Sequence, residues 1–353
     1  MTMRLLHTYI LYVLSALLLN AQEMREWNIT LLKQQNLGTW AVPAGNYSGI
    51  TYLGGNEFAV VSDSEATDGF FTLTLQIDPI TGSVLQAGRS AIKGAGLGNR
   101  DAEDIAYNPS TKTLFVVGEK DQKILEYNID GTLTGRQVTV PQSLSSEAIY
   151  PNYGFESLAY SPAGDLLWTV TEHTLRADGR PSDATNAEGC KLRLQSFDGT
   201  TLKPVAQYAY ITDTPTAHKL ADHYAFGVSA LTAMEDGSLL VLEREFYVAE
   251  KQVGSYVRNK IYRVIPALAT PLSDQQNLST LTQDQFMRKA LVADFTTKLG
   301  VSGLTLANYE GMCLGPKLAD GSQTLILISD SQNNYGNKLF HLKDYVKVIK
   351  IKN

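Results

Sequence analysis

The sequence predicts an all-β fold, a β-propeller of four-stranded antiparallel blades, with five blades favoured and a six-bladed ring as the alternative. Three observations support this prediction. A composition with 28 glycines and 18 tyrosines suits many short strands joined by tight turns. One short sequence phrase recurs five times along the chain, and a turn signal such as Gly54-Gly55 or Asp236-Gly237 lies inside each copy.

Each copy begins with a Ser or Glu, one further residue and an aliphatic residue, and continues through a turn into an apolar strand. The copies start at Ser48, Glu103, Glu156, Ser229 and Glu310. Their apolar second strands read FAVVSD, LFVVGE, LWTVTE, LLVLER and LILISD, so most of them end in an acid. A single unit of this kind cannot bury both faces of its sheet, whereas units packed around an axis bury one another.

A third strand follows each pair, from residues 70–78 in the first copy to 337–342 in the last, and most copies have room for a fourth. The last copy has no evident fourth strand, while residues 28–34 read as a strand without a blade. We therefore expect the N-terminal strand to complete the last blade and close the ring. The insertion at 266–288 includes Thr282 and Gln285 at capping-box spacing, which predicts a short helix.

The chain begins with a segment typical of a secretory signal peptide. Arg4 precedes the uncharged run at 10–19, and Ala21 supplies a small residue for cleavage. We expect residues 1–21 to be removed and residues 22–353 to form one propeller domain, exported to the periplasm or the cell exterior, with no membrane span. Cys190 and Cys313 either pair or remain two separate buried thiols, and the sequence leaves both alternatives open.

The charge balance argues against a nucleic-acid partner. Thirty Lys and Arg residues stand against 36 Asp and Glu, for a net charge of −6, and no basic run offsets this. No G-x-S-x-G or H-E-x-x-H motif is present, so an α/β-hydrolase or a zinc protease is not supported. The expected partner is a small molecule or an anionic ester, and the oligomeric state is left open.

Three repeats carry a glutamate at the same position, and this suggests a metal site. Alternation along a strand places Glu103 on the face of Ile105, and the other two glutamates likewise. Carboxylates from three blades would then converge on the axis, where they would repel one another or bind a cation. We expect Glu103, Glu156 and Glu310 to bind Ca²⁺. The alternative is that each glutamate accepts hydrogen bonds from the next blade and only locks the ring.

A second acidic set ends the second strands, and it suggests a catalytic rim formed by Glu172, His173, Arg244 and Asp330. Arg244 could clamp a phosphate or carboxylate through two hydrogen bonds, and the alternative is an ion pair with Glu243, Glu245 or a neighbouring blade. His173 could act as a general acid or base, and the alternative is a hydrogen-bonded residue at a strand end.

Four phrases of the chain resemble the phytase-like propeller family described as having esterase-like activity of phytase. They lie at 152–172, 228–245, 259–266 and 308–334, and the resemblance extends over roughly residues 45–342. It implies a propeller and a phosphoester or other ester substrate.

Three functions follow from these observations. The first is an exported hydrolase of a phosphoester or other ester with a calcium-supported acidic pocket. The second is a propeller that binds a glycan, peptide or small molecule without chemistry. The third is a lactonase-like hydrolase of sugar acids. The sequence leaves open whether the protein is an enzyme.

Overall fold

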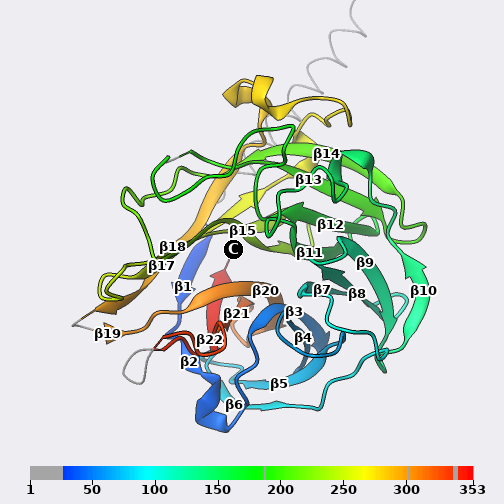
Figure 1. Cartoon of the computed structure of the whole chain (residues 1–353). Helices are drawn as coiled ribbons and strands as arrows, with labels where there is room; N and C mark the ends of the chain where they lie inside the picture. Colours follow the sequence, from blue (N-terminus) through cyan, green and yellow to red (C-terminus); the bar gives the residue numbers. More distant parts are fainter. Residues whose placement is uncertain (1–26, 187, 301–302, 337–340, 353) are drawn as a thin grey trace, which may run out of the picture.

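Five antiparallel sheets are arranged around one axis in the computed structural model, and the predicted five-bladed propeller is confirmed (Figure 1). The structure describes residues 27–186, 188–300, 303–336 and 341–352. The predicted signal peptide at 1–21 lies outside the described residues. Among the helices of the described residues, none is long and apolar enough to cross a membrane.

Each blade has four main strands, which are named below from the axis outward. The first blade contains β3 (Tyr47–Gly54), β4 (Glu57–Ser62), β5 (Phe71–Ile77) and β6 (Val84–Arg89). The second contains β7 (Ala102–Asn108), β8 (Thr113–Gly118), β9 (Lys123–Asn128) and β10 (Leu133–Gln137). The third contains β11 (Phe155–Ser161), β12 (Leu166–Thr171), β13 (Lys191–Asp198) and β14 (Pro204–Ile211).

The last two blades carry additional short strands. The fourth contains β15 (His223–Ala233), β16 (Leu239–Val248), β17 (Tyr256–Val264) and β18 (Lys289–Gly300), extended by β19 (Gly303–Leu304). The fifth contains β20 (Asn308–Lys317), β21 (Gln323–Asp330), β22 (Tyr345–Lys352) and β1 (Asn28–Leu31), and β2 (Gln35–Asn36) also pairs with β22.

The N-terminal strand closes the ring as predicted. Asn28 lies opposite Lys352 and Leu31 opposite Ile349, so β1 is the outer strand of the last blade, beside β22 (Figure 1). The predicted third strand at 337–342 is wrong, because the strand that pairs with β21 is β22; residues 337–340 lie outside the described residues. β22 fits the third position of the blade because apolar side chains on both of its faces pack against neighbouring blades.

The hydrophobic core consists of layers between adjacent blades. Between the first and last blades, for example, Phe58 and Val60 share a buried cluster with Ile326, Ile328 and Val348. The alternating apolar residues of each strand therefore face a neighbouring blade on either side, and this explains why the second strands read as nearly continuous apolar runs.

A β-bulge interrupts every inner strand at the same position of the repeat. In β7, Ala102 lies opposite Gly118 and Asp104 opposite Val117, so Glu103 is an extra residue between them. The five extra residues are Ser48, Glu103, Glu156, Ser229 and Glu310, the first residues of the five copies. A bulge disturbs alternation and redirects the side chain. Each of these first residues therefore lies at the point where strict alternation along the inner strand is interrupted.

One buried carboxylate next to a bulge joins the inner strands of adjacent blades. Asp104 is 1% exposed and accepts hydrogen bonds from the Leu158 N–H at 2.7 Å and the Ile105 N–H at 2.8 Å. A Cβ added at Gly49 would lie 2.4 Å from Asp104 Oδ1, so the first blade tolerates this carboxylate only because residue 49 is glycine. Asp104 thus performs the locking role that the sequence suggested for the glutamates.

The insertion at 266–288 protects the edge of the third blade. It contains three short 3₁₀ helices, η3 (Pro266–Leu268), η4 (Leu278–Thr280) and η5 (Gln283–Gln285), and the last of them follows the predicted capping box at Thr282. The Leu272 N–H donates to the Gln207 carbonyl, so the insertion supplies a partner to the outer strand β14. Cys190 and Cys313 are both free and buried.

We predict that Asp104→Ala destabilises the fold strongly. The variant leaves the Leu158 and Ile105 N–H groups buried without an acceptor, at a cost of about 1–3 kcal/mol each. Urea unfolding measures the effect. Asp130→Ala is the matched control, because Asp130 accepts a backbone hydrogen bond in an exposed turn, and this variant should lose much less stability than Asp104→Ala. Equal losses in the two variants would contradict the role given to Asp104.

Candidate functional site

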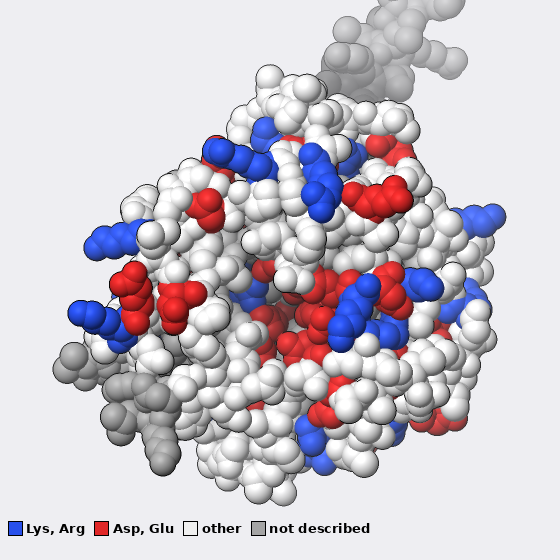
Figure 2. All heavy atoms as spheres, viewed as in Figure 1, with Lys and Arg blue, Asp and Glu red and all other residues white. Residues whose placement is uncertain are grey.

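Eight carboxylates gather at one end of the central channel. Inner and second strands are antiparallel, so the beginning of each inner strand lies beside the end of the second strand. We call this set the acidic channel; its members are Asp63, Asp101, Glu103, Glu119, Glu156, Glu172, Glu310 and Asp330. Figure 2 shows Asp and Glu side chains gathered in a central hollow, with Lys and Arg side chains at its rim and farther out.

Arg244 is the buried cation of the acidic channel. It extends from β16, is 4% exposed, and donates to Glu172 at 2.5 Å and to Glu310. It also donates to Asn308 Oδ1 at 3.2 Å. Glu172 belongs to the third blade and Glu310 to the fifth, so Arg244 joins the two blades that flank its own. The structure therefore agrees with the ion pair to neighbouring blades that the sequence offered as the alternative to a ligand clamp.

The two acids next to Arg244 in the chain face other groups. Glu243 accepts hydrogen bonds from Lys289 at 2.6 Å and from Tyr210 at 2.5 Å. Glu245 accepts from the backbone N–H of Thr216 at 2.9 Å. Strand alternation explains the separation, since residues 243 and 245 share one face of β16 and residue 244 lies on the other. An ion pair of Arg244 with Glu243 or Glu245 is therefore wrong.

Three carboxylates of the second blade lie at the spacing of metal ligands. Oxygens of Asp101, Glu103 and Glu119 all lie within 4.8 Å of one another. Asp101 adopts a left-handed backbone with φ of 57°, a conformation that Asp and Asn adopt more readily than most residues, and Glu119 accepts a hydrogen bond from the Gly154 N–H at 2.9 Å. Glu103 is 9% exposed, and no described residue donates a hydrogen bond to its carboxylate.

The predicted metal ligands Glu103, Glu156 and Glu310 all belong to the acidic channel, but they are not held alike. Glu310 is bound to Arg244, and the close partners of Glu103 among the described residues are Asp101 and Glu119. The carboxylates that lie close together therefore come from one hairpin of one blade, and not from the bulges of three different blades. Asp101 was missed by the sequence analysis, and its only signal was an acid two residues before Glu103.

The crowding of negative charge changes the acidity of the channel. Burial, with repulsion from Glu156 and Glu310, holds the pKa of Glu103 well above its usual range. Burial, with repulsion from Glu310 and Asp101, raises the pKa of Asp63 to about 7. Burial raises the pKa of Glu172 to about 7 even though the Arg244 charge opposes the shift. The channel therefore retains protons near neutral pH unless another cation replaces them.

Two predicted catalytic residues are enclosed by internal hydrogen bonds. Asp330 is fully buried and accepts from the backbone N–H of Gln332 at 2.7 Å and from its side-chain amide. His173 is 1% exposed; the Thr174 nitrogen lies 2.8 Å from its Nδ1, and the Ser182 nitrogen and Cys190 Sγ lie 2.8 Å and 3.1 Å from its Nε2. Burial lowers the pKa of His173 to about 4, so the ring is neutral at ordinary pH.

The other end of the channel is apolar. A cavity of about 350 Å³ is lined there by the ends of all five inner strands. Its wall includes the aliphatic residue that follows each bulge by two positions, and these five are almost fully buried: Ile50, Ile105, Leu158, Leu231 and Met312. This aliphatic ring lies between the acidic channel and the apolar cavity.

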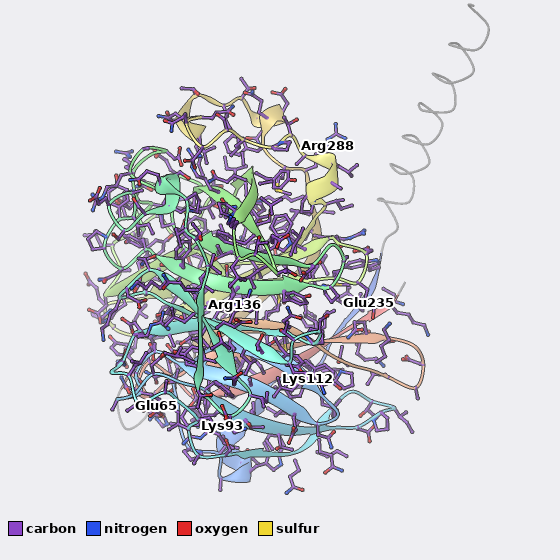
Figure 3. All side chains as sticks on the ribbon, turned by 90° about the vertical axis from the view of Figure 1, so that its right-hand side faces the viewer. Glu65, Lys93, Lys112, Arg136, Glu235 and Arg288 are labelled. Atoms are coloured by element: carbon purple, nitrogen blue, oxygen red, sulfur yellow. The ribbon has the colours of Figure 1, made fainter. Side chains whose placement is uncertain are left out.

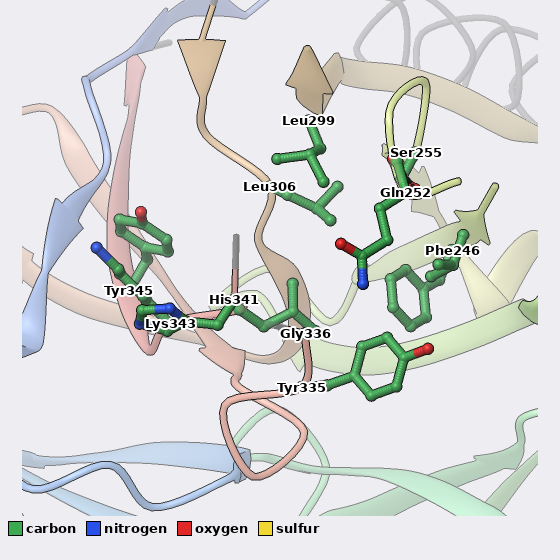
Figure 4. Close-up of a pocket in the computed structure, with 12 residues that line it drawn as sticks. Phe246, Gln252, Ser255, Leu299, Leu306, Tyr335, Gly336, His341, Lys343 and Tyr345 are labelled. Atoms are coloured by element: carbon green, nitrogen blue, oxygen red, sulfur yellow. Dashed lines mark hydrogen bonds between the residues drawn. The ribbon is translucent and has the colours of Figure 1, made fainter. Parts of the chain in front are cut away.

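A smaller pocket of about 70 Å³ lies between the fourth and fifth blades. Figure 4 shows Phe246, Leu306 and Tyr335 around it, and no Asp or Glu is among the described residues that line it. Charged side chains outside the channel are scattered: Figure 3 shows Lys93, Lys112 and Arg136 at separate points of the outer surface. The acidic channel is thus the site where charged groups of several blades meet.

Fold and site together define a five-bladed propeller with an acidic channel at one end of its axis. A family model described as "Phytase-like: Esterase-like activity of phytase" matches residues 42–335, and the chain belongs to this family. The resemblance found in the sequence is confirmed. No curated protein matches the chain.

Several solved structures are similar at low identity. A member of the DUF4221 family from Bacteroides vulgatus is 11% identical, with a TM-score of 0.42 and coverage of 93% of this chain and 99% of that one. The catalytic domain of a GH62 α-L-arabinofuranosidase from Coprinopsis cinerea is 10% identical, with a TM-score of 0.43 and coverage of 92% and 96%. A streptogramin B lyase is 11% identical, with a TM-score of 0.35 and coverage of 92% and 98%. Likeness at this level carries no information on function.

We predict that the metal-free protein becomes less stable as the pH rises from about 5 to about 7.5. Asp63 and Glu172 have raised pKa values in the folded state, so their stabilising effect is complete below the pKa of the unfolded chain and is lost as they ionise near pH 7. Each pKa unit corresponds to about 1.4 kcal/mol. Urea unfolding in EDTA at the two pH values measures the change. Constant or rising stability would contradict the prediction.

We also predict that Arg244→Ala destabilises the fold by about 3–5 kcal/mol, because Glu172 and Glu310 would keep buried charge without a partner. Adding Glu172→Gln to this variant should restore part of the loss. Arg180→Ala is the matched control, since its pair with Glu188 is exposed and screened by solvent, and its loss should change the stability little. If Arg244→Ala unfolds like the wild type but no longer binds inorganic phosphate, the clamp interpretation is correct instead.

Proposed function

We propose that this protein is an exported, calcium-dependent hydrolase of a phosphoester or other ester. The observation that carries the proposal is the carboxylate triad Asp101, Glu103 and Glu119, in which the nearly buried Glu103 has no hydrogen-bond donor among the described residues. A carboxylate in such a place needs a proton or a cation. Family membership supports the ester class of substrate.

The triad suits Ca²⁺ in its chemistry. Calcium takes six to eight oxygen ligands, mainly carboxylates, carbonyls and water. The three carboxylates supply charged oxygens from one hairpin, and Asp101 and Glu119 are partly exposed, which leaves the site open to solvent and substrate. No histidine or cysteine belongs to the described triad, so its ligand set favours a hard cation.

The acidic channel needs such a cation before it can admit an anionic substrate. A bound calcium supplies positive charge that offsets the carboxylates and polarises the ester oxygen. Arg244 contributes by neutralising Glu172 and Glu310, but its terminal nitrogens are already bonded within the protein. We therefore place the substrate beside the triad, and not against Arg244, Asp330 or His173 as the sequence suggested. The aliphatic ring lies between the acidic channel and the apolar cavity, so it restricts the access of water from the side of the cavity.

We predict that Ca²⁺ raises the melting temperature and that a chelator lowers it. Binding to the folded state alone adds about 2.7 kcal/mol at a hundredfold excess over Kd. Glu103→Gln should abolish this shift while keeping the fold, whereas Glu235→Gln, at the exposed far end, should leave it unchanged. Both measurements use thermal unfolding of the mature protein. An unchanged melting temperature in calcium would contradict the metal site.

The reaction itself is tested with p-nitrophenyl phosphate, p-nitrophenyl acetate and a sugar-acid lactone, each with calcium and with EDTA. Calcium-dependent hydrolysis of either nitrophenyl ester supports the proposal. Turnover of the lactone alone would identify a lactonase-like enzyme instead. A calcium-dependent melting shift without turnover of any of the three would favour a propeller that binds a ligand without chemistry.

A further inference from the structure

Two carboxylates of the acidic channel are bound neither to Arg244 nor to a backbone amide, and they do not belong to the triad. Glu172 and Glu310 are bound to Arg244, and Asp330 is bound to Gln332. Asp101, Glu103 and Glu119 form the triad. One is Asp63, which lies in the turn after β4 and whose Oδ1 is buried without a hydrogen-bond partner among the described residues. The other is Glu156, which lies within strand β11; it is partly exposed, and no described residue hydrogen-bonds to its carboxylate.

Glu156 lies between the triad and the buried arginine. It is the bulge residue of β11 in the third blade, which separates the second blade from the fourth. The charged groups that act on it come from every neighbouring element: Glu172 from its own blade, Glu119 from the second, Glu310 from the fifth and Arg244 from the fourth. A substrate that extends from the triad toward Arg244 would therefore meet Glu156.

The backbone of Glu156 is held rigidly. Phe155 pairs with Thr171 and Ser157 with Val170, and Ser157 is fully buried. The next N–H along the strand, that of Leu158, donates to the locking carboxylate of Asp104 at 2.7 Å. A reactive group on a rigid strand keeps its direction better than one on a loop. The bulge thus presents an accessible carboxylate from a fixed support.

We propose that Glu156 is the general base of the hydrolysis, an inference that rests on the proposed function. Its carboxylate takes a proton from a water molecule while the water oxygen forms a bond to the ester carbon or phosphorus. The bond from that atom to the leaving oxygen breaks, and the leaving oxygen takes the proton back from the Glu156 carboxyl group. One water is consumed, an acid and an alcohol are released, and Glu156 is regenerated.

The test compares Glu156→Gln with the wild type and with Glu103→Gln. For whichever nitrophenyl ester the wild type hydrolyses, Glu156→Gln should lower kcat by about 10²–10⁴-fold and leave KM within about threefold. Its melting temperature should still rise with calcium as in the wild type, whereas that of Glu103→Gln should not. Glu235→Gln, at the far end of the molecule, should retain full kcat.

A second variant separates catalysis from structure. Glu156→Ala should be equally slow, and added formate should restore part of its kcat, because a free carboxylate can occupy the vacated space and accept the proton. A structural role would give no such rescue. Unchanged kcat in Glu156→Gln would overturn the inference, and so would a lost calcium shift, which would make Glu156 a ligand. If the wild type hydrolyses neither ester, the proposed function fails, and this inference fails with it.

Discussion

The bulge at the start of each inner strand is the constraint on which the channel depends. In a regular strand, the residues after the first would alternate between the faces packed on the two neighbouring blades. At this extra residue Glu103, Glu156 and Glu310 belong to the acidic end of the channel, and the aliphatic residues two positions later line the apolar cavity. One local irregularity, repeated around the axis, therefore places acids above an apolar layer.

The carboxylates of the acidic channel repel one another, and the residues around them neutralise only part of this charge. Eight carboxylates face one buried guanidinium, and both partners of Arg244 come from the blades beside its own. Removing charges from water is costly unless each is paired and hydrogen-bonded. Arg244 satisfies Glu172 and Glu310, and Asp104 is satisfied by backbone N–H groups. Asp63 Oδ1 and the carboxylates of Glu103 and Glu156 receive no hydrogen bond from the described residues, so the channel depends on protons or a cation from solvent.

The aliphatic ring strengthens these interactions. Ile50, Ile105 and Leu158 are each at most 2% exposed, and they lie between the carboxylates and the apolar cavity at the far end. An apolar layer lowers the local dielectric response and strengthens attraction to a bound cation as well as repulsion among the acids. Packing of the core and acidity of the site are therefore coupled, since the same inner strands supply both.

The sequence by itself determined the propeller, its five repeats and the strand that closes the ring. The reason is that apolar strands and turn residues are recognisable within a short segment and recur in each copy. It also indicated that acids gather at one end of the axis. Only the tertiary structure decided which of these acids lie next to one another and which are paired with Arg244. Asp101 joins Glu103 and Glu119, while Arg244 takes Glu172 and Glu310. A bulge and a contact between blades depend on register and packing among distant segments, which periodicity within one segment cannot reveal.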